Sequence, residues 1–253
     1  MNGIYMAELM PPSEIKELIS QTGAGVELLR FGVSENLEHL PEQLKIAEKE
    51  LLEYGSPEIT LHGPFLDLNP ASYESLVREA TFRRFEQCYQ AARCLGARKI
   101  VYHTCRIPAT VYLEGWAERM ADFWNRFLDG KEGITVCMEN VFEPEYEGIL
   151  QTAQAVSHPD FSICLDIGHV HCFSERPPGE WIHALKGRIS HVHLHDNDGS
   201  RDAHLALSEG TIDLEEIFGA LKTERNLTWT VECRSGEDVR KSIRILQKMT
   251  VQN

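Results

Sequence analysis

Side chains that can bind metal ions gather in one stretch of the chain, residues 191–210, with the sequence HVHLHDNDGSRDAHLALSEG. His191, His193 and His195 alternate with aliphatic residues, which predicts a strand with three imidazoles on one face. Asp202 and His204 follow two residues apart, in a loop that could fold both towards one ion. A polar surface hairpin with solvated histidines is the alternative. The density of imidazoles and carboxylates at a strand end favours a divalent-metal site.

The elements that must position these ligands follow a regular alternation of β-rich runs and amphipathic helical stretches. Strands are predicted at residues 4–8, 26–31, 58–62, 99–103, 134–139, 162–166, 190–195 and 228–232. Helices are predicted at residues 12–22, 41–54, 73–95, 112–128, 146–156, 179–185, 214–223 and 237–249. No repeat or long linker interrupts the pattern. Eight βα units in about 250 residues predict a single α/β domain over residues 1–253, a (β/α)8 TIM barrel.

The alternation within each strand predicts which side chains face the barrel interior. Aliphatic residues such as Ile59 and Leu61 occupy the phase that would face the helices, and small or polar residues occupy the other phase. In six consecutive strands the inward phase ends at or near a residue that can bind a metal, on the side where barrel enzymes build active sites. These residues are His62, His103, Glu139, Asp166, His193 and Glu232, and the loops that follow add His169, Asp202 and His204.

A mixed set of imidazoles and carboxylates is typical of zinc, manganese or cobalt sites, and nine ligands exceed what one ion needs. We therefore expect two or three divalent metal ions, Zn or Mn, per chain, with carboxylates such as Glu139 bridging them. Each residue alone has an ordinary alternative, because a single interior histidine is more often a hydrogen-bonded core residue. Cys137 and Cys164 fall in the inward phase and are interpreted as packing residues.

The composition limits the class of protein. A formal net charge of −14 disfavours nucleic acid as a partner, because non-specific nucleic-acid binding depends mainly on clustered Lys and Arg. Seven cysteines at irregular spacing, with no Cys-x-x-Cys pair, indicate reduced thiols and a cytoplasmic protein. No secretory signal is visible and no apolar run approaches 18 residues, so no membrane contact is expected. The expected partner is a small molecule, and a homo-oligomer is left open.

Short motifs in a fixed order resemble those of one family, the xylose-isomerase-like barrels, over nearly the whole chain. The motifs are LHGPF around His62, CMEN with Glu139, CLDIGHVH with Asp166 and His169, HVHLHDN with His193, DAHLALSEGTID with Asp202 and His204, and VEC with Glu232. This family contains sugar and sugar-phosphate isomerases and epimerases, inosose-processing enzymes and the DNA-repair enzyme endonuclease IV. The resemblance implies a xylose isomerase-like TIM barrel with a metal site at its rim.

The resemblance to the epimerases implies a one-metal core formed by Glu139, Asp166, His193 and Glu232. Glu139 and Glu232 would be the catalytic residues, one removing the proton next to a carbonyl and the other returning it, while the metal stabilises the enediolate. His169 would then contact the substrate. We therefore expect a metal-dependent isomerase or epimerase that acts on a sugar or a sugar phosphate.

Endonuclease IV supplies the alternative function, a metal-dependent phosphodiesterase acting at abasic sites. The resemblance places its five further ligands on His62, His103, His169, Asp202 and His204. Against this function, the loops at 142–147 and 196–202 are mainly acidic, where endonuclease IV inserts Arg and bulky side chains into DNA. Ser208 also stands where the family usually has glycine, which leaves the local loop shape open. A barrel that binds a sugar without catalysis is a third alternative.

Three further residues are predicted to contact the substrate. Arg106 and Arg201 could bind a phosphate or carboxylate group, with a solvated arginine as the alternative for each. His195 is also predicted to contact the substrate. His171, His191 and His195 could instead orient the metal ligands through hydrogen bonds.

Overall fold

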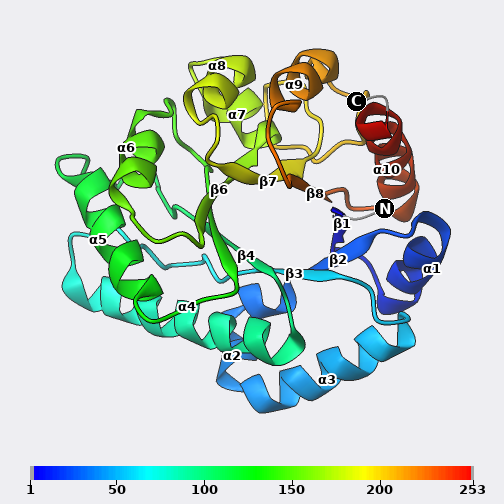
Figure 1. Cartoon of the computed structure of the whole chain (residues 1–253), viewed down its shortest axis with the longest axis horizontal. Helices are drawn as coiled ribbons and strands as arrows, with labels where there is room; N and C mark the ends of the chain where they lie inside the picture. The colour runs from blue at the N-terminus through cyan, green and yellow to red at the C-terminus, as the bar shows by residue number, and fades with distance from the viewer. Residues whose placement is uncertain (1–2, 252–253) are drawn as a thin grey trace.

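Eight parallel strands close into a barrel in sequence order in the computed structural model, which describes residues 3–251 (Figure 1). The strands are β1 (Ile4–Ala7), β2 (Gly25–Leu28), β3 (Ile59–His62), β4 (Lys99–His103), β5 (Thr135–Glu139), β6 (Phe161–Asp166), β7 (Ile189–Leu194) and β8 (Thr228–Val231). The barrel closes where β1 pairs with β8. The predicted (β/α)8 fold is confirmed, whereas residues 1–2 and 252–253 of the predicted domain lie outside the described residues.

Helices surround the barrel on its outer side (Figure 1). They are α1 (Pro12–Thr22), α2 (Ser34–Glu38), α3 (Leu40–Glu53), α4 (Ser75–Leu95), α5 (Trp116–Leu128), α6 (Glu147–Ala155), α7 (Ile167–Phe173), α8 (Pro178–Ala184), α9 (Leu214–Leu221) and α10 (Gly236–Val251), with the 3-10 turn η1 (Arg30–Gly32). The sequence analysis did not predict α2, α7 or η1. Within residues 3–251, no helix combines the length and the apolar character that crossing a bilayer requires.

The predicted strand at 26–31 is too long, because β2 ends at Leu28. The Glu8 carboxylate accepts hydrogen bonds from the backbone N–H groups of Leu29 and Arg30, at 3.1 and 3.2 Å, and the chain turns there into η1. Phe31 consequently leaves the sheet and is fully buried in the core outside it. The hydrophobic pattern alone extends across this turn and therefore hides it.

The two faces of the strands separate two buried regions, as the alternation predicted. Ile59 and Leu61 belong to the main core between strands and helices, whereas Val101, Cys137 and Cys164 form their own cluster inside the barrel. Burial raises the pKa of the Cys137 thiol. The interpretation of these two cysteines as packing residues fits their position.

An aromatic cluster fixes β4 against the outer helices. The indole of Trp124 in α5 is fully buried, and its ring centroid lies 5.7 Å from that of Phe85 in α4 and 5.8 Å from that of Tyr102 in β4. The Tyr102 hydroxyl donates a 2.8 Å hydrogen bond to the Phe85 carbonyl oxygen. Because Tyr102 is the residue before His103, this packing sets the direction in which the His103 side chain enters the barrel.

Candidate metal centre

The nine residues predicted as metal ligands meet at the carboxyl ends of strands β3 to β8. Seven of them line a cavity of about 480 Å³, while Asp166 and His193 lie fully buried beneath it. The lining residues are Leu9, Leu29, Gly32, Val33, His62, Phe65, Leu66, His103, Glu139, Val141, Phe142, His169, Asp202, His204, Glu232 and Arg234. The structure therefore brings the predicted ligands together, and their role in binding metal stays a prediction.

The ligand atoms fall into three groups. The first group is His62, His103 and Glu139: Glu139 Oε2 lies 3.6 Å from His62 Nε2 and 3.4 Å from His103 Nε2. The two imidazole nitrogens are 3.1 Å apart. All three residues come from strand ends, of β3, β4 and β5.

The second group shares Glu139 with the first and adds Asp166, His193 and Glu232. His193 Nδ1 lies 3.4 Å from Glu139 Oε1, 3.2 Å from Glu232 Oε1 and 3.9 Å from Asp166 Oδ2. One imidazole nitrogen thus faces three carboxylates, and Glu139 offers one oxygen to each group.

The third group is His169, Asp202 and His204. Asp202 Oδ2 lies 3.6 Å from His169 Nε2 and 3.1 Å from His204 Nε2. His169 belongs to α7, which begins directly after β6, where the Asp166 side chain caps the helix by accepting a 2.7 Å hydrogen bond from His169 N.

These separations match the spacing of ligands around one ion. Four ligand atoms placed about 2.0–2.1 Å from a zinc ion in a tetrahedron lie roughly 3.3–3.4 Å from one another. Within the three groups the separations run from the 3.1 Å between His204 and Asp202 to the 3.9 Å between His193 and Asp166. Each group could therefore enclose a divalent ion after small movements of its side chains.

Backbone carbonyl groups fix three of the imidazole rings. The Nδ1 atom of His62 lies 2.9 Å from the Gly63 carbonyl oxygen, that of His169 lies 2.9 Å from Asn140 O, and that of His204 lies 2.7 Å from Glu232 O. A carbonyl oxygen can only accept, so Nδ1 must carry a proton, and in the neutral ring Nε2 then directs its lone pair towards the group. Metal-binding histidines are normally held in this way.

A buried carboxylate that the sequence analysis missed, Glu27 of β2, lies beneath the second group. Glu27 is fully buried, and its Oε1 is 3.0 Å from His193 Nε2, on the ring edge opposite Nδ1. Its Oε2 accepts hydrogen bonds from Thr60 and Thr230, both 2.9 Å, and lies 3.1 Å from His191 Nε2. The sequence pattern could have predicted this position. Glu27 stands between two aliphatic residues, Val26 and Leu28, which are buried in the structure, so the alternation places Glu27 in the inward phase.

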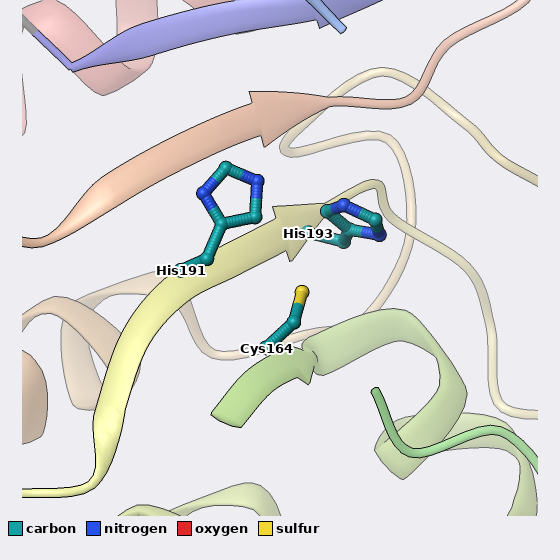
Figure 2. Close-up of side chains that lie close together, drawn as sticks. All are labelled: Cys164, His191 and His193. Carbon is teal, nitrogen blue, oxygen red and sulfur yellow. The ribbon is translucent and has the colours of Figure 1, made fainter. Parts of the chain in front are cut away.

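Figure 2 shows His191 and His193 of β7 and Cys164 of β6 close together in the barrel interior. Although their types suit a metal, both nitrogens of His191 are already in contact with protein, Nδ1 with Thr228 Oγ1 at 2.6 Å and Nε2 with Glu27. Burial lowers the pKa of His191 to about 4, which keeps its ring neutral. We interpret this layer as the support beneath the ligands.

The electric field of the groups favours cations. Burial alone would lower the pKa of His169, but the carboxylates of Asp166, Asp202 and Glu139 outweigh it and raise that pKa to about 10. Burial likewise opposes ionisation of Glu139, but His103 and His193 hold its pKa well below the usual range. Carboxylates that stay ionised while buried need a positive partner, which a proton on an imidazole or a divalent ion can supply.

Unpartnered buried atoms provide an independent test of whether the residues fit a metal. Glu139 Oε2, Asp166 Oδ2, His193 Nδ1 and Asp202 Oδ1 are buried and have no hydrogen-bond partner among the described residues. Buried polar atoms normally have one. Glu139 Oε2, Asp166 Oδ2 and His193 Nδ1 point into the groups defined above, so this donor set fits divalent ions. Asp202 Oδ1 instead faces His195 Nε2, at 3.4 Å.

The loop after β7 delivers Asp202 and His204 because Asp196 folds it back. Asp196 pairs with Leu205 in an isolated antiparallel bridge, and its carboxylate accepts hydrogen bonds from Ser208 N at 2.9 Å and Ile212 N at 3.3 Å. Ser208 adopts the left-handed conformation, with φ of 69°. This is the conformation that glycine favours, so Ser208 reproduces the turn expected of the usual glycine at some cost in strain.

The residues predicted as substrate contacts are placed less centrally. Arg201 is exposed, and neither it nor Arg106 is among the residues that line the cavity. His195 is fully buried and also does not line it. Arg234 does line the cavity. Substrate contact by Arg106, His195 and Arg201 stays a prediction.

Comparison with known proteins agrees with the closed-barrel fold. The family model described as the xylose isomerase-like TIM barrel matches residues 17–249. An uncharacterised protein of Methanocaldococcus jannaschii is 30% identical over 77% of this chain and 80% of its own length. A probable endonuclease 4 of Mycobacterium leprae is 27% identical, over 77% of this chain and 79% of its own.

Among solved structures, a D-tagatose 3-epimerase-like protein superposes with a TM-score of 0.81 at 24% identity, covering 98% of this chain and 97% of its own, which shows the shared fold. The match of the family model to most of the chain, together with the closed barrel, leads to one conclusion: the chain belongs to the xylose isomerase-like TIM barrel family.

Proposed function

We propose that this protein is a divalent-metal-dependent isomerase or epimerase that moves a proton next to the carbonyl group of a sugar or sugar phosphate. One observation carries the proposal: Glu139 Oε1 and Glu232 Oε1 lie 3.4 and 3.2 Å from the same atom, His193 Nδ1, and both residues line the cavity. Removing and returning a proton needs two such groups beside one substrate carbon.

Glu139 and Glu232 are the proposed catalytic residues. One carboxylate takes the proton from the carbon next to the carbonyl, the C–H electron pair forms the new C=C bond, and the carbonyl electrons move to oxygen. The other residue, present as the acid, returns a proton to carbon. Return to the opposite face of the same carbon, as the original C=O bond re-forms, gives an epimer. Return to the former carbonyl carbon gives an isomer, because the neighbouring hydroxyl then loses its proton to the former carbonyl oxygen and becomes the new carbonyl group.

We propose two or three ions, Zn or Mn, held by the three groups. When bound, a divalent ion supplies the positive charge that stabilises an oxyanion developing on the substrate. The cavity lining includes apolar side chains such as Phe65 and Phe142, which would exclude water from the reacting carbon. The guanidinium of Arg234, which also lines the cavity, would bind a substrate phosphate.

Proton exchange from solvent tests the proposal directly. Zinc- or manganese-loaded protein is incubated in deuterated water with ketohexoses, ketopentoses and their phosphates, and NMR follows the proton next to the carbonyl. At least one sugar should exchange, and Glu139→Gln and Glu232→Gln should each lower the rate by a factor of about 10² to 10⁴. Metal content is measured for each variant, since a rate lost together with the ion says nothing about proton transfer.

Glu143→Gln is the matched control. Glu143 is also a buried carboxyl group, but it accepts hydrogen bonds from Thr104 Oγ1 and Val141 N outside the three groups. This variant should keep the exchange rate. If fully loaded protein exchanges no proton with any sugar of the panel, the proposal is wrong.

A second candidate function is a metal-dependent phosphodiesterase of the endonuclease IV type. The observation that favours it is the third group, because an epimerase that uses one ion needs only the second. Against it stand the net charge of −14 and the acidic loops. Incision of duplex DNA at an abasic analogue by the zinc-loaded protein would replace the first proposal with this one.

A further inference from the structure

His195, which follows the end of β7, lies between the second and third groups, and the proposed function assigns it no role. The side chain is fully buried, and its ring stacks on the His204 ring with centroids 4.0 Å apart and planes 16° from parallel. Two rings stacked in this way cannot direct their lone pairs at one ion, because the ion would lie outside the plane of at least one of them. His195 is therefore not a fourth ligand of the ion that His204 would bind.

The contacts of His195 Nε2 connect the two groups. This nitrogen lies 3.3 Å from Asp166 Oδ1 and 3.4 Å from Asp202 Oδ1. The other oxygens of the same carboxylates face the ligand histidines: Asp166 Oδ2 lies 3.9 Å from His193 Nδ1, and Asp202 Oδ2 lies 3.1 Å from His204 Nε2. Each carboxylate thus turns one oxygen to its own group and the other to His195.

Gly168 leaves the space that the His195 ring occupies. A Cβ atom added at Gly168, in the first turn of α7, would lie only 1.9 Å from His195 Cε1, so only glycine leaves room there. Both ring nitrogens of His195, and Asp202 Oδ1, are buried without a hydrogen-bond partner among residues 3–251. The two carboxylate oxygens near Nε2, Asp166 Oδ1 and Asp202 Oδ1, are the acceptors that a proton on this nitrogen could reach.

We propose that His195 is a positioning residue that joins the second and third groups by sharing its Nε2 proton between Asp166 and Asp202. This shared proton fixes the orientation of both carboxylates. It therefore fixes the direction in which Asp166 Oδ2 and Asp202 Oδ2 point towards the ions of the second and third groups. Hydrogen bonds that orient metal ligands change metal affinity by about 10- to 100-fold. The inference rests on the metal binding in the proposed function, and it adds that the ions of the second and third groups depend on one side chain.

Zinc titration of the metal-free full chain against a chromophoric chelator tests the inference. His195→Ala should weaken the binding of two ions by about 10- to 100-fold each, while the ion of the first group, which His195 does not contact, keeps its affinity. His195→Gln should restore most of the loss, because its amide nitrogen reaches the position of Nε2 and still donates a hydrogen bond. His158→Ala, with a half-buried imidazole that accepts from Asp160 N in the turn before β6, is the control and should match the wild type.

Two results would overturn the inference. Unchanged affinities in His195→Ala would show that the ring does not position the carboxylates. A Gln variant as weak as the Ala variant would show that Nε2 acts through its lone pair, as a ligand, or that the ring only fills space. The titration needs no turnover, so failure of the proton-exchange experiment leaves this inference intact, and the reverse also holds.

Discussion

Replacing Glu27 with glutamine should weaken metal binding without removing any ligand. The carboxylate is fully buried, its Oε1 lies 3.0 Å from His193 Nε2, and its Oε2 accepts from Thr60 and Thr230. Burial by itself would raise the pKa of Glu27, but His193 and His191 outweigh it and hold that pKa well below its usual range. The ionised Glu27 carboxylate beside His193 Nε2 keeps the ring proton on that nitrogen. His193 Nδ1 therefore keeps its lone pair available for an ion.

The size of the effect follows from the contact that is lost. A hydrogen bond to a charged group contributes about 1.5–3 kcal/mol, and glutamine keeps the shape of the side chain but removes its charge. The zinc affinity of the second group should therefore fall roughly 10- to 100-fold. Glutamine must also place an NH2 group where an oxygen accepted hydrogen bonds, so a lower melting temperature of the metal-free protein is expected as well.

Competition with a zinc chelator measures the affinity, and thermal unfolding of the metal-free protein measures the stability separately. Glu143→Gln is again the matched control, as a buried carboxyl group that contacts no ligand histidine. An unchanged zinc affinity in Glu27→Gln, with the control also unchanged, would refute the view that Glu27 orients His193.

Three further predictions concern the pH dependence and the core. Because the carboxylates raise the pKa of His169 to about 10, its imidazole is protonated at neutral pH in the metal-free protein and must release that proton to bind an ion. Zinc affinity should then rise with pH by roughly tenfold per unit for each proton released. Calorimetry in buffers of different ionisation enthalpy would detect the released protons. A zinc affinity that does not change between about pH 6 and 8 would contradict this prediction. Trp124→Ala should cost about 3–5 kcal/mol of the free energy of unfolding, measured in urea, because it empties the fully buried centre of the aromatic cluster, and Trp124→Phe should cost clearly less. Gly63→Ala should cost about 1–3 kcal/mol, since its Cβ would lie 2.1 Å from the Tyr102 ring, and a melting temperature equal to that of the wild type would contradict the close approach.

The sequence alone determined the order of the elements and the phase of the strands. A period of two in the strands and of 3.6 in the helices is a local property, so it can be read without knowing the fold. For the same reason the inward positions of His62, His103 and Glu139 were predictable, because a parallel barrel brings the carboxyl ends of its strands to one rim. Boundaries set by a single side chain were not, and the turn that Glu8 imposes after Leu28 is the example.

Only the tertiary structure decided which groups touch. Glu27 lies 166 residues before His193 in the chain, yet the closed barrel places its carboxylate on the ring edge opposite the metal-facing nitrogen. The different roles of His191, His193 and His195 were equally hidden, although the sequence pattern predicts one strand face for all three. In the structure His191 and His193 belong to β7, and His195 follows its end. His191 contacts Thr228 and Glu27, His193 faces the carboxylates of the second group, and His195 faces Asp166 Oδ1 and Asp202 Oδ1. Periodicity fixes the side of a strand from which a side chain projects, but its depth in the barrel and its partners depend on barrel closure and loop folding, which join residues far apart in the chain.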